Sequence, residues 1–105
     1  MPFRVLVTER AEVHIRAIDA WWQEHRMAAR HLFREELAAS FDLLAAAPLC
    51  GRSYPHPSLE DIRRLLLRSS RFHVYYTVQM DTILVLTVWS AVRGSGPDLG
   101  ALTSS

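Results

Sequence analysis

The second half of the chain alternates hydrophobic runs with short polar breaks. Residues 62–67, 71–78 and 83–89 are each rich in β-branched, aromatic and aliphatic side chains. Ser69–Ser70 separates the first two runs, and Met80–Asp81 separates the last two. Hydrophobic runs with breaks this short are typical of strands joined by tight turns. The pattern therefore predicts a three-stranded antiparallel meander.

The first half of the chain has the periodicity of helices. Phe3–Val7 predicts a short strand, and Thr8 lies where it can cap a helix that runs to about Arg26. The apolar stripe of this helix consists of Ala11, Ile15, Ile18 and Trp22. A second helix, which Pro48 ends, has a stripe of Phe33, Leu37, Phe41 and Leu44. Because their connection is short, the two helices are expected to form an antiparallel hairpin.

Side chains alternate along the predicted strands, which assigns them to two faces of a sheet. In the middle strand the core face consists of Phe72, Val74, Tyr76 and Val78, and the opposite face of Arg71, His73, Tyr75, Thr77 and Gln79. In the last strand the core face is assigned to Leu84, Leu86 and Val88, and the open face to Ile83, Val85, Thr87 and Trp89. The polar Thr87 decides this second assignment. We predict an α+β fold in which helices cover one face of a small four-stranded sheet.

Composition indicates a single folded domain over residues 1–105, with a flexible C-terminal tail from about residue 94. Half of the residues are hydrophobic and 22% are charged, which is typical of a folded protein. No stretch has the length of a membrane span or the pattern of a secretory signal, which predicts a cytoplasmic protein without membrane association. The single cysteine, Cys50, cannot form an internal disulfide, in keeping with a reducing compartment.

Positive charge is concentrated in the meander and is carried by arginine alone. All 12 cationic side chains are Arg. The net charge is −2 up to Asp61 and +3 from Ile62 onward, which matches the total of +1. The planar guanidinium group pairs well with carboxylates and phosphates. The meander is therefore the half that is suited to bind an anionic partner.

Arg64, Arg71, His73 and Tyr75 are the candidate functional residues within the meander. Metal-free RNA cleavage needs a base for the 2′-hydroxyl, an acid for the leaving oxygen and a cation for the phosphorane charge. These four residues would supply that set if they met on one face. The alternative is ordinary strand composition, in which a tyrosine serves cross-strand pairing. The histidines lack metal-ligand spacing, so no metal and no cofactor is expected.

Trp21 and Trp22 form an unusual pair of adjacent aromatic residues. Two neighbouring helical residues cannot both face the same core, so one of them must lie at a boundary. Half-buried packing on the second helix is one interpretation. The other is an interface with a partner or a second copy, because exposed Trp is enriched at binding hot spots.

The order of one strand, two helices and a meander resembles the ParE/RelE superfamily of small bacterial toxins, including plasmid stabilization proteins. The similarity covers roughly residues 3–93. Its motifs are Arg63-Arg64-Leu65, Arg71-Phe72-His73-Val74-Tyr75-Tyr76 and Val85-Leu86-Thr87-Val88-Trp89. The resemblance implies the toxin of a type II toxin–antitoxin module. Such a toxin is held inactive by a cognate antitoxin, here in a heterotetramer or larger assembly.

Two activities are known in this superfamily, and the resemblance implies one of them. RelE-like members cleave mRNA on the ribosome and commonly carry Tyr or His near the C-terminus, whereas ParE-like members bind and inhibit DNA gyrase. After Trp89 the chain contains no Tyr, His or Lys, and Arg93 is its only cation. This favours a gyrase-binding toxin over an mRNA endonuclease. The residues expected to bind the target or the antitoxin are Arg64, Arg71, Tyr75, Trp89 and Arg93. A module that only binds an antitoxin is the third alternative.

Overall fold

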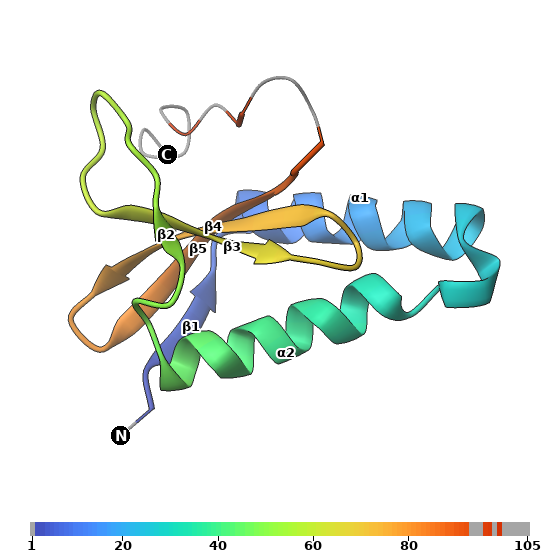
Figure 1. The fold of residues 1–105 in the computed structure, drawn as a ribbon, viewed down its shortest axis with the longest axis horizontal. Coiled ribbons are helices and arrows are strands. Elements are labelled where there is room, and N and C mark those ends of the chain that lie inside the picture. Colours follow the sequence, from blue (N-terminus) through green and yellow to red (C-terminus); the bar gives the residue numbers. More distant parts are fainter. Residues whose placement is uncertain (1, 93–95, 98, 100–105) are drawn as a thin grey trace.

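The structure is a computed structural model, and it describes residues 2–92, 96, 97 and 99. Two helices lie on one side of a mixed sheet (Figure 1). The elements in order are β1 (Arg4–Val7), α1 (Glu9–His25), the 3-10 helix η1 (Met27–Ala29), α2 (Leu32–Ala46), β2 (Arg52–Ser53), β3 (Ile62–Leu67), β4 (Phe72–Gln79) and β5 (Thr82–Ser90). None of the described helices is long and apolar enough to cross a membrane.

The sheet has five strands in the order β1-β5-β4-β3-β2. Strands β3, β4 and β5 form the predicted antiparallel meander. Strand β1 pairs parallel with β5 and lies at one edge. The prediction of four strands was wrong by one, because β2 adds two residues at the other edge. Both residues of β2 are exposed, so this strand carries no hydrophobic pattern that sequence reasoning could detect.

The helical hairpin forms as predicted. The hydroxyl of Thr8 caps α1 by accepting a hydrogen bond from the backbone N–H of Ala11 at 3.1 Å. Glu9 and Glu12 lie in the first turn, where the helix dipole favours acidic side chains. Helix α2 ends at Ala46, shortly before Pro48. Figure 1 shows α1 and α2 running in opposite directions along one side of the sheet.

The main hydrophobic core lies between the helices and the sheet. Its buried helical residues are Ala11, Trp22, Phe33, Leu37 and Leu44. From β4, Val74 and Tyr76 are fully buried in this core, and Phe72 and Val78 pack against it. The predicted core face of the middle strand is therefore confirmed.

The predicted faces of the last strand were wrong from Ile83 to Leu86 and right for Val88 and Trp89, because β5 contains a bulge. Tyr75 pairs with Thr87, but the next residue, Tyr76, pairs with Val85, so Leu86 has no partner on β4. An unpaired residue shifts the alternation of side chains between the two faces. As a result, Ile83, Val85 and Val88 belong to the main core, whereas Leu84, Leu86 and Trp89 pack on the other face.

Thr87 and Tyr75 were predicted to lie on an open face of the sheet, but both are buried. Thr87 is fully buried, and its hydroxyl lies 2.6 Å from Nδ1 of His14 on α1. Tyr75 is 2% exposed, in a second cluster that includes Ile62 and Leu86. The cover comes from Tyr54 and Leu59 in the β2–β3 loop and from Leu99. Figure 1 shows this loop rising on the side of the sheet away from α2.

The expected open face is thus partly closed by the chain itself. A hydrophobic second face needs a cover, and the long β2–β3 loop supplies much of it. Leu99 is fully buried, although it lies within the predicted C-terminal tail. Residues 93–95, 98 and 100–105 are outside the described residues, so most of that prediction is not addressed.

Candidate functional site

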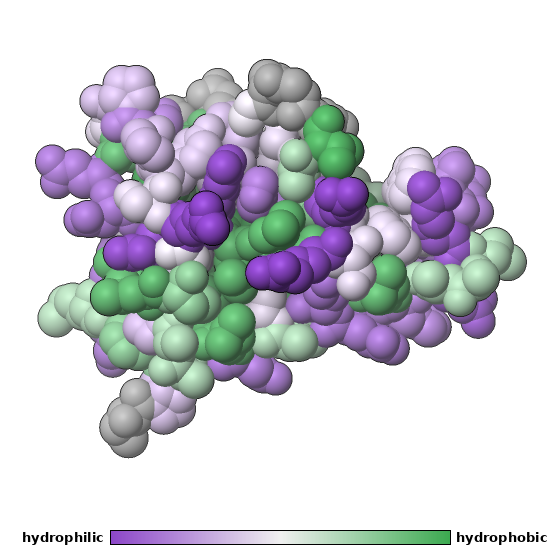
Figure 2. Space-filling view, in the orientation of Figure 1, coloured by the Kyte–Doolittle hydropathy of each residue, from purple (hydrophilic) through white to green (hydrophobic). Residues whose placement is uncertain are grey.

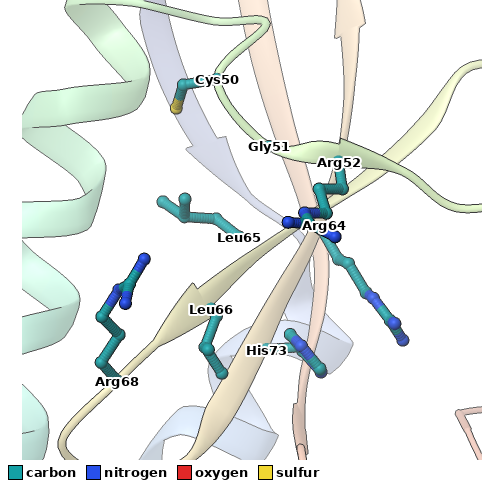
Figure 3. Close-up of a pocket in the computed structure, with 8 residues that line it drawn as sticks. All are labelled: Cys50, Gly51, Arg52, Arg64, Leu65, Leu66, Arg68 and His73. Carbon is teal, nitrogen blue, oxygen red and sulfur yellow. The ribbon is translucent and has the colours of Figure 1, made fainter.

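A cavity of about 330 Å³ lies beside β3, next to the short strand β2. We call it the cationic cavity. It is lined by Cys50, Gly51, Arg52, Arg64, Leu65, Leu66, Arg68 and His73 (Figure 3). These lining residues include three arginines and no carboxylate. In Figure 2, strongly hydrophilic side chains surround a hydrophobic strip in the middle of this face.

Strand pairing explains why these side chains meet. Arg64 pairs with Arg52 of β2 on one side and with Tyr75 of β4 on the other. Leu66, two residues further along β3, pairs with His73. Directly paired residues of neighbouring strands project on the same face. The pairings therefore place Arg64, Leu66, His73 and Tyr75 on the face of the sheet that the helices leave uncovered.

The wall of the cavity around Gly51 is held by buried hydrogen bonds. The backbone N–H of Gly51 donates to the hydroxyl of Tyr76 at 2.9 Å, and that hydroxyl donates to the carbonyl of Pro48 at 2.8 Å. Arg63 donates to the carbonyl of Gly51 at 2.8 Å. A Cβ atom at Gly51 would lie 2.5 Å from the Tyr76 hydroxyl, so only glycine fits without movement. These hydrogen bonds hold in place the backbone that precedes Arg52.

The charge of the cavity comes from its arginines. Burial, and then the charge of Arg64, lower the pKa of His73 below its usual value of 6.5. The neutral form of His73 is thus favoured beside Arg64. Burial raises the pKa of Tyr75, although the neighbouring Arg64 opposes this shift. The guanidinium of Arg64 also lies 5.1 Å from the ring centre of Tyr54, within the range of a cation–π contact.

The structure brings three of the four predicted catalytic candidates together. The rings of His73 and Tyr75 have their centres 5.9 Å apart, and Arg64 pairs across from Tyr75. The phenol ring of Tyr75 is covered by Tyr54, whose ring centre is 5.0 Å away. Arg71 lies elsewhere, in the β3–β4 turn, where it lines a different cavity.

The three tryptophans among the predicted site residues do not line the cationic cavity. Trp89 packs beside the Tyr75 cluster, and its ring centre lies 6.1 Å from that of His14. Trp22 is 7% exposed, whereas Trp21 is 43% exposed and stacks on His25. Arg93 is outside the described residues. Within the described part of the chain, no three His, Cys, Asp or Glu side chains are grouped closely enough to hold a metal ion.

Sequence reasoning missed Arg52 as a member of the cavity. Arg52 precedes the first residue of the meander, Ile62, by ten positions in the sequence. Only the β2–β3 pairing brings it beside Arg64. The available signal was the neighbouring Gly51, because a glycine is used where the backbone must approach another group closely. That signal by itself does not identify the strand that the backbone approaches.

Comparisons with known proteins identify a family and a similar fold. A family model described as the ParE toxin of the type II toxin–antitoxin system, parDE, matches residues 5–93. Among solved structures, the chain is similar to a mutant of the E. coli toxin RelE in its free state, with 19% sequence identity and a TM-score of 0.57. The similarity covers 99% of this chain and 93% of that chain. At this identity the likeness is one of fold. A search of curated proteins found no match.

Proposed function

Since the chain belongs to the ParE toxin family of type II toxin–antitoxin systems, we propose that it is a cytoplasmic toxin that inhibits DNA gyrase by binding to it. Membership of this family implies a cognate antitoxin as partner. In our proposal the antitoxin neutralises the toxin within a heterotetramer or a larger assembly. The cationic cavity is the surface that engages the gyrase–DNA complex.

The observation that carries this proposal is the chemistry of the cationic cavity. Arg52, Arg64 and Arg68 supply fixed positive charge, which suits phosphates or carboxylates. Tyr75, one candidate for a general acid, is 2% exposed beneath Tyr54 and has a raised pKa. A catalytic acid must come within hydrogen-bond reach of the leaving oxygen. The cavity is thus better equipped to hold an anionic group than to cleave RNA.

The proposal is tested with purified toxin, gyrase and relaxed plasmid DNA. We expect the toxin to inhibit supercoiling and to increase the amount of cleaved DNA. Arg64→Ala and Arg68→Ala should each weaken inhibition by about tenfold, the loss expected for one charge-assisted contact. Arg30→Ala is the matched control, because Arg30 is exposed and lines neither of the cavities described for this chain. Ribosome-dependent mRNA cleavage that is lost in His73→Ala would refute the proposal.

The second candidate function is a RelE-like, ribosome-dependent mRNA endonuclease. The observation that favours it is the grouping of Arg64, His73 and Tyr75 on one face. For this activity Tyr75 would have to become accessible when the ribosome binds. The same assays distinguish the two functions, because gyrase inhibition without RNA cleavage contradicts this one. Normal growth when the toxin is expressed alone would instead indicate a module that only binds its antitoxin.

A further inference from the structure

A second cavity, of about 540 Å³, lies between the C-terminal half of α1 and the β3–β4 turn. It shares no lining residue with the cationic cavity. Helix α1 contributes Ile18, Trp21 and Trp22 to its wall, β4 contributes Phe72, and the turn after β5 contributes Val92. We call this cavity the Trp21 groove.

Large apolar side chains of the Trp21 groove are exposed to solvent. Trp21 is 43% exposed and Val92 is 71% exposed, and both line the same depression. A lone exposed hydrophobic residue is ordinary, but several around one groove mark an interaction site. Trp22, at 7% exposure, also has an indole N–H without an acceptor among the described residues. The groove is therefore a preformed apolar surface that lacks a cover in the described part of the chain.

The polar groups around the groove are cationic. The guanidinium carbon of Arg26 lies 5.2 Å from the ring centre of Trp21 and 6.0 Å from that of Trp22. Arg71 lines the opposite wall. None of the described lining residues is acidic. Glu36, which contacts the same turn, is already hydrogen-bonded to Ser69 and Ser70. An anionic group entering the groove would thus meet two arginines without competition from a carboxylate of the wall.

The backbone that carries Arg71 is held rigidly. Its N–H donates to the carbonyl of Leu67 and its carbonyl accepts from the N–H of Ala91, both at 2.9 Å. Arg71 has a φ of 66°, in the left-handed region that a non-glycine residue rarely adopts. Because both backbone groups are bonded, this conformation is maintained and directs Arg71 from a fixed position. The backbone of this residue is therefore ordered before a partner binds, and its exposed side chain supplies the cation.

We propose that the Trp21 groove is the docking site for an acidic, amphipathic segment of the cognate antitoxin. A large apolar side chain of that segment packs between Trp21 and Phe72, and flanking Asp or Glu side chains pair with Arg26 and Arg71. The proposal rests on the proposed function for the existence of an antitoxin, and it adds where the antitoxin binds and what chemistry it needs. Buried Trp and Arg side chains are the residue types that dominate binding energy at protein interfaces.

A second copy of the chain is a poorer occupant. In a two-fold symmetric contact the same surface lies on both sides. Arg26 and Arg71 of one copy would then face the same cations of the other, and like charges in an interface disfavour association. An acidic partner segment fits the charge of the groove and removes its apolar surface from water.

The test measures binding of the purified product of the adjacent antitoxin gene by titration calorimetry. Trp21→Ala and Arg26→Glu should each weaken binding by at least about 30-fold, the effect of a hot-spot residue. Both variants should still arrest growth when expressed alone, because neither residue lines the cationic cavity. Arg30→Glu is the matched charge control and should bind within about threefold of the wild type. Circular dichroism and thermal unfolding confirm that each variant is folded.

Two outcomes overturn the inference. The first is binding of the antitoxin by Trp21→Ala and Arg26→Glu with wild-type affinity. The second is a wild-type dimer in analytical ultracentrifugation that Trp21→Ala converts to a monomer without any change in antitoxin affinity. Failure of the proposed function gives a different result. In that case the toxin would not inhibit gyrase, but binding of the antitoxin to the toxin would still depend on Trp21 and Arg26.

Discussion

The carboxylate of Glu36, on α2, binds both the backbone and the side chain of Ser70 in the β3–β4 turn. Ser70 donates to it from its N–H at 2.9 Å and from its hydroxyl at 2.6 Å. The N–H of Ser69 donates to the other carboxylate oxygen at 2.8 Å. One acidic side chain thus satisfies two backbone donors of a turn that the sheet leaves unpaired. This contact links the helical layer to the turn that carries Arg71.

Glu36→Gln should lower the free energy of unfolding by about 1–3 kcal/mol at pH 7, because it removes charge-assisted hydrogen bonds. Burial alone would raise the pKa of Glu36, but the bonds from Ser70 and Ser69 lower it below its usual value of 4.5. The stabilisation is therefore complete above pH 4.5 and is lost as the pH falls through the lowered pKa.

Urea denaturation at pH 7 and at pH 3 measures this effect. The difference between wild type and Glu36→Gln should be larger at pH 7 than at pH 3. Glu35→Gln is the control, since Glu35 is exposed on the same turn of α2, and its effect should stay below about 0.5 kcal/mol. An equal difference at both pH values would contradict the role assigned to the charged carboxylate.

Met80→Gly should stabilise the protein by up to about 1 kcal/mol and raise Tm by a few degrees. Met80 lies in the tight turn between β4 and β5 with a φ of 56°, which disfavours any side chain. Its side chain is 95% exposed, so glycine loses no packing. Met80→Ala retains the Cβ atom and should leave Tm nearly unchanged. A lower Tm for the glycine variant would show that backbone strain at this turn is negligible.

Gly51→Ala should destabilise the protein by about 1–3 kcal/mol, the usual effect of overpacking. The new Cβ atom would lie 2.5 Å from the Tyr76 hydroxyl and 2.9 Å from the Arg64 carbonyl. The backbone must shift to relieve these contacts, which weakens the bond from Gly51 to Tyr76. Thermal unfolding measures the loss. Ser53→Ala, at an exposed position of β2, should change Tm little, and equal effects of both variants would contradict the prediction.

Arg64→Ala should raise the pKa of the His73 imidazole toward 6.5, because burial and the charge of Arg64 together hold it down. A histidine pKa that is lowered by folding makes stability decline as the pH falls below 6.5. The variant should therefore lose part of this acid sensitivity. NMR titration of the His73 ring measures the pKa. Arg68→Ala is the control, because Arg68 lines the same cavity and should shift the pKa less. An unchanged pKa in Arg64→Ala would refute the electrostatic coupling.

Much of the fold could be predicted from local patterns. The runs that form β3, β4 and β5 have strand periodicity, and the stripes of α1 and α2 have helical periodicity. The core face of β4 was predicted correctly because the extra residue of the bulge is on β5, so the alternation of side chains along β4 is undisturbed. The bulge at Leu86 could not be predicted, since it arises from how β5 pairs with β4 and leaves no mark in the alternation of residues. The faces predicted for Ile83 to Leu86 were wrong for this reason, whereas Thr87 shares the face of its partner Tyr75 but is buried there.

In the candidate site, too, some features could be predicted from the sequence and others depended on tertiary contacts. The types of residue and the concentration of arginine in the meander were visible in the sequence, and Arg64, His73 and Tyr75 do share one face. Which arginines meet was decided by tertiary contacts. Arg52 joins Arg64 through β2, whereas Arg71 turns away to the Trp21 groove. The burial of Tyr75 depends on the loop and on Leu99, which are distant in sequence.

The sequence by itself determined the elements, their order, the location of the positive charge and the resemblance to a toxin family. These properties depend on local spacing and on composition, which each segment carries with it. Only the tertiary structure decided which side chains share a cavity and which are covered. Those outcomes depend on strand register, on a single unpaired residue at Leu86 and on loop packing. Such long-range contacts are set by the free energy of the whole folded chain and by no single segment of it.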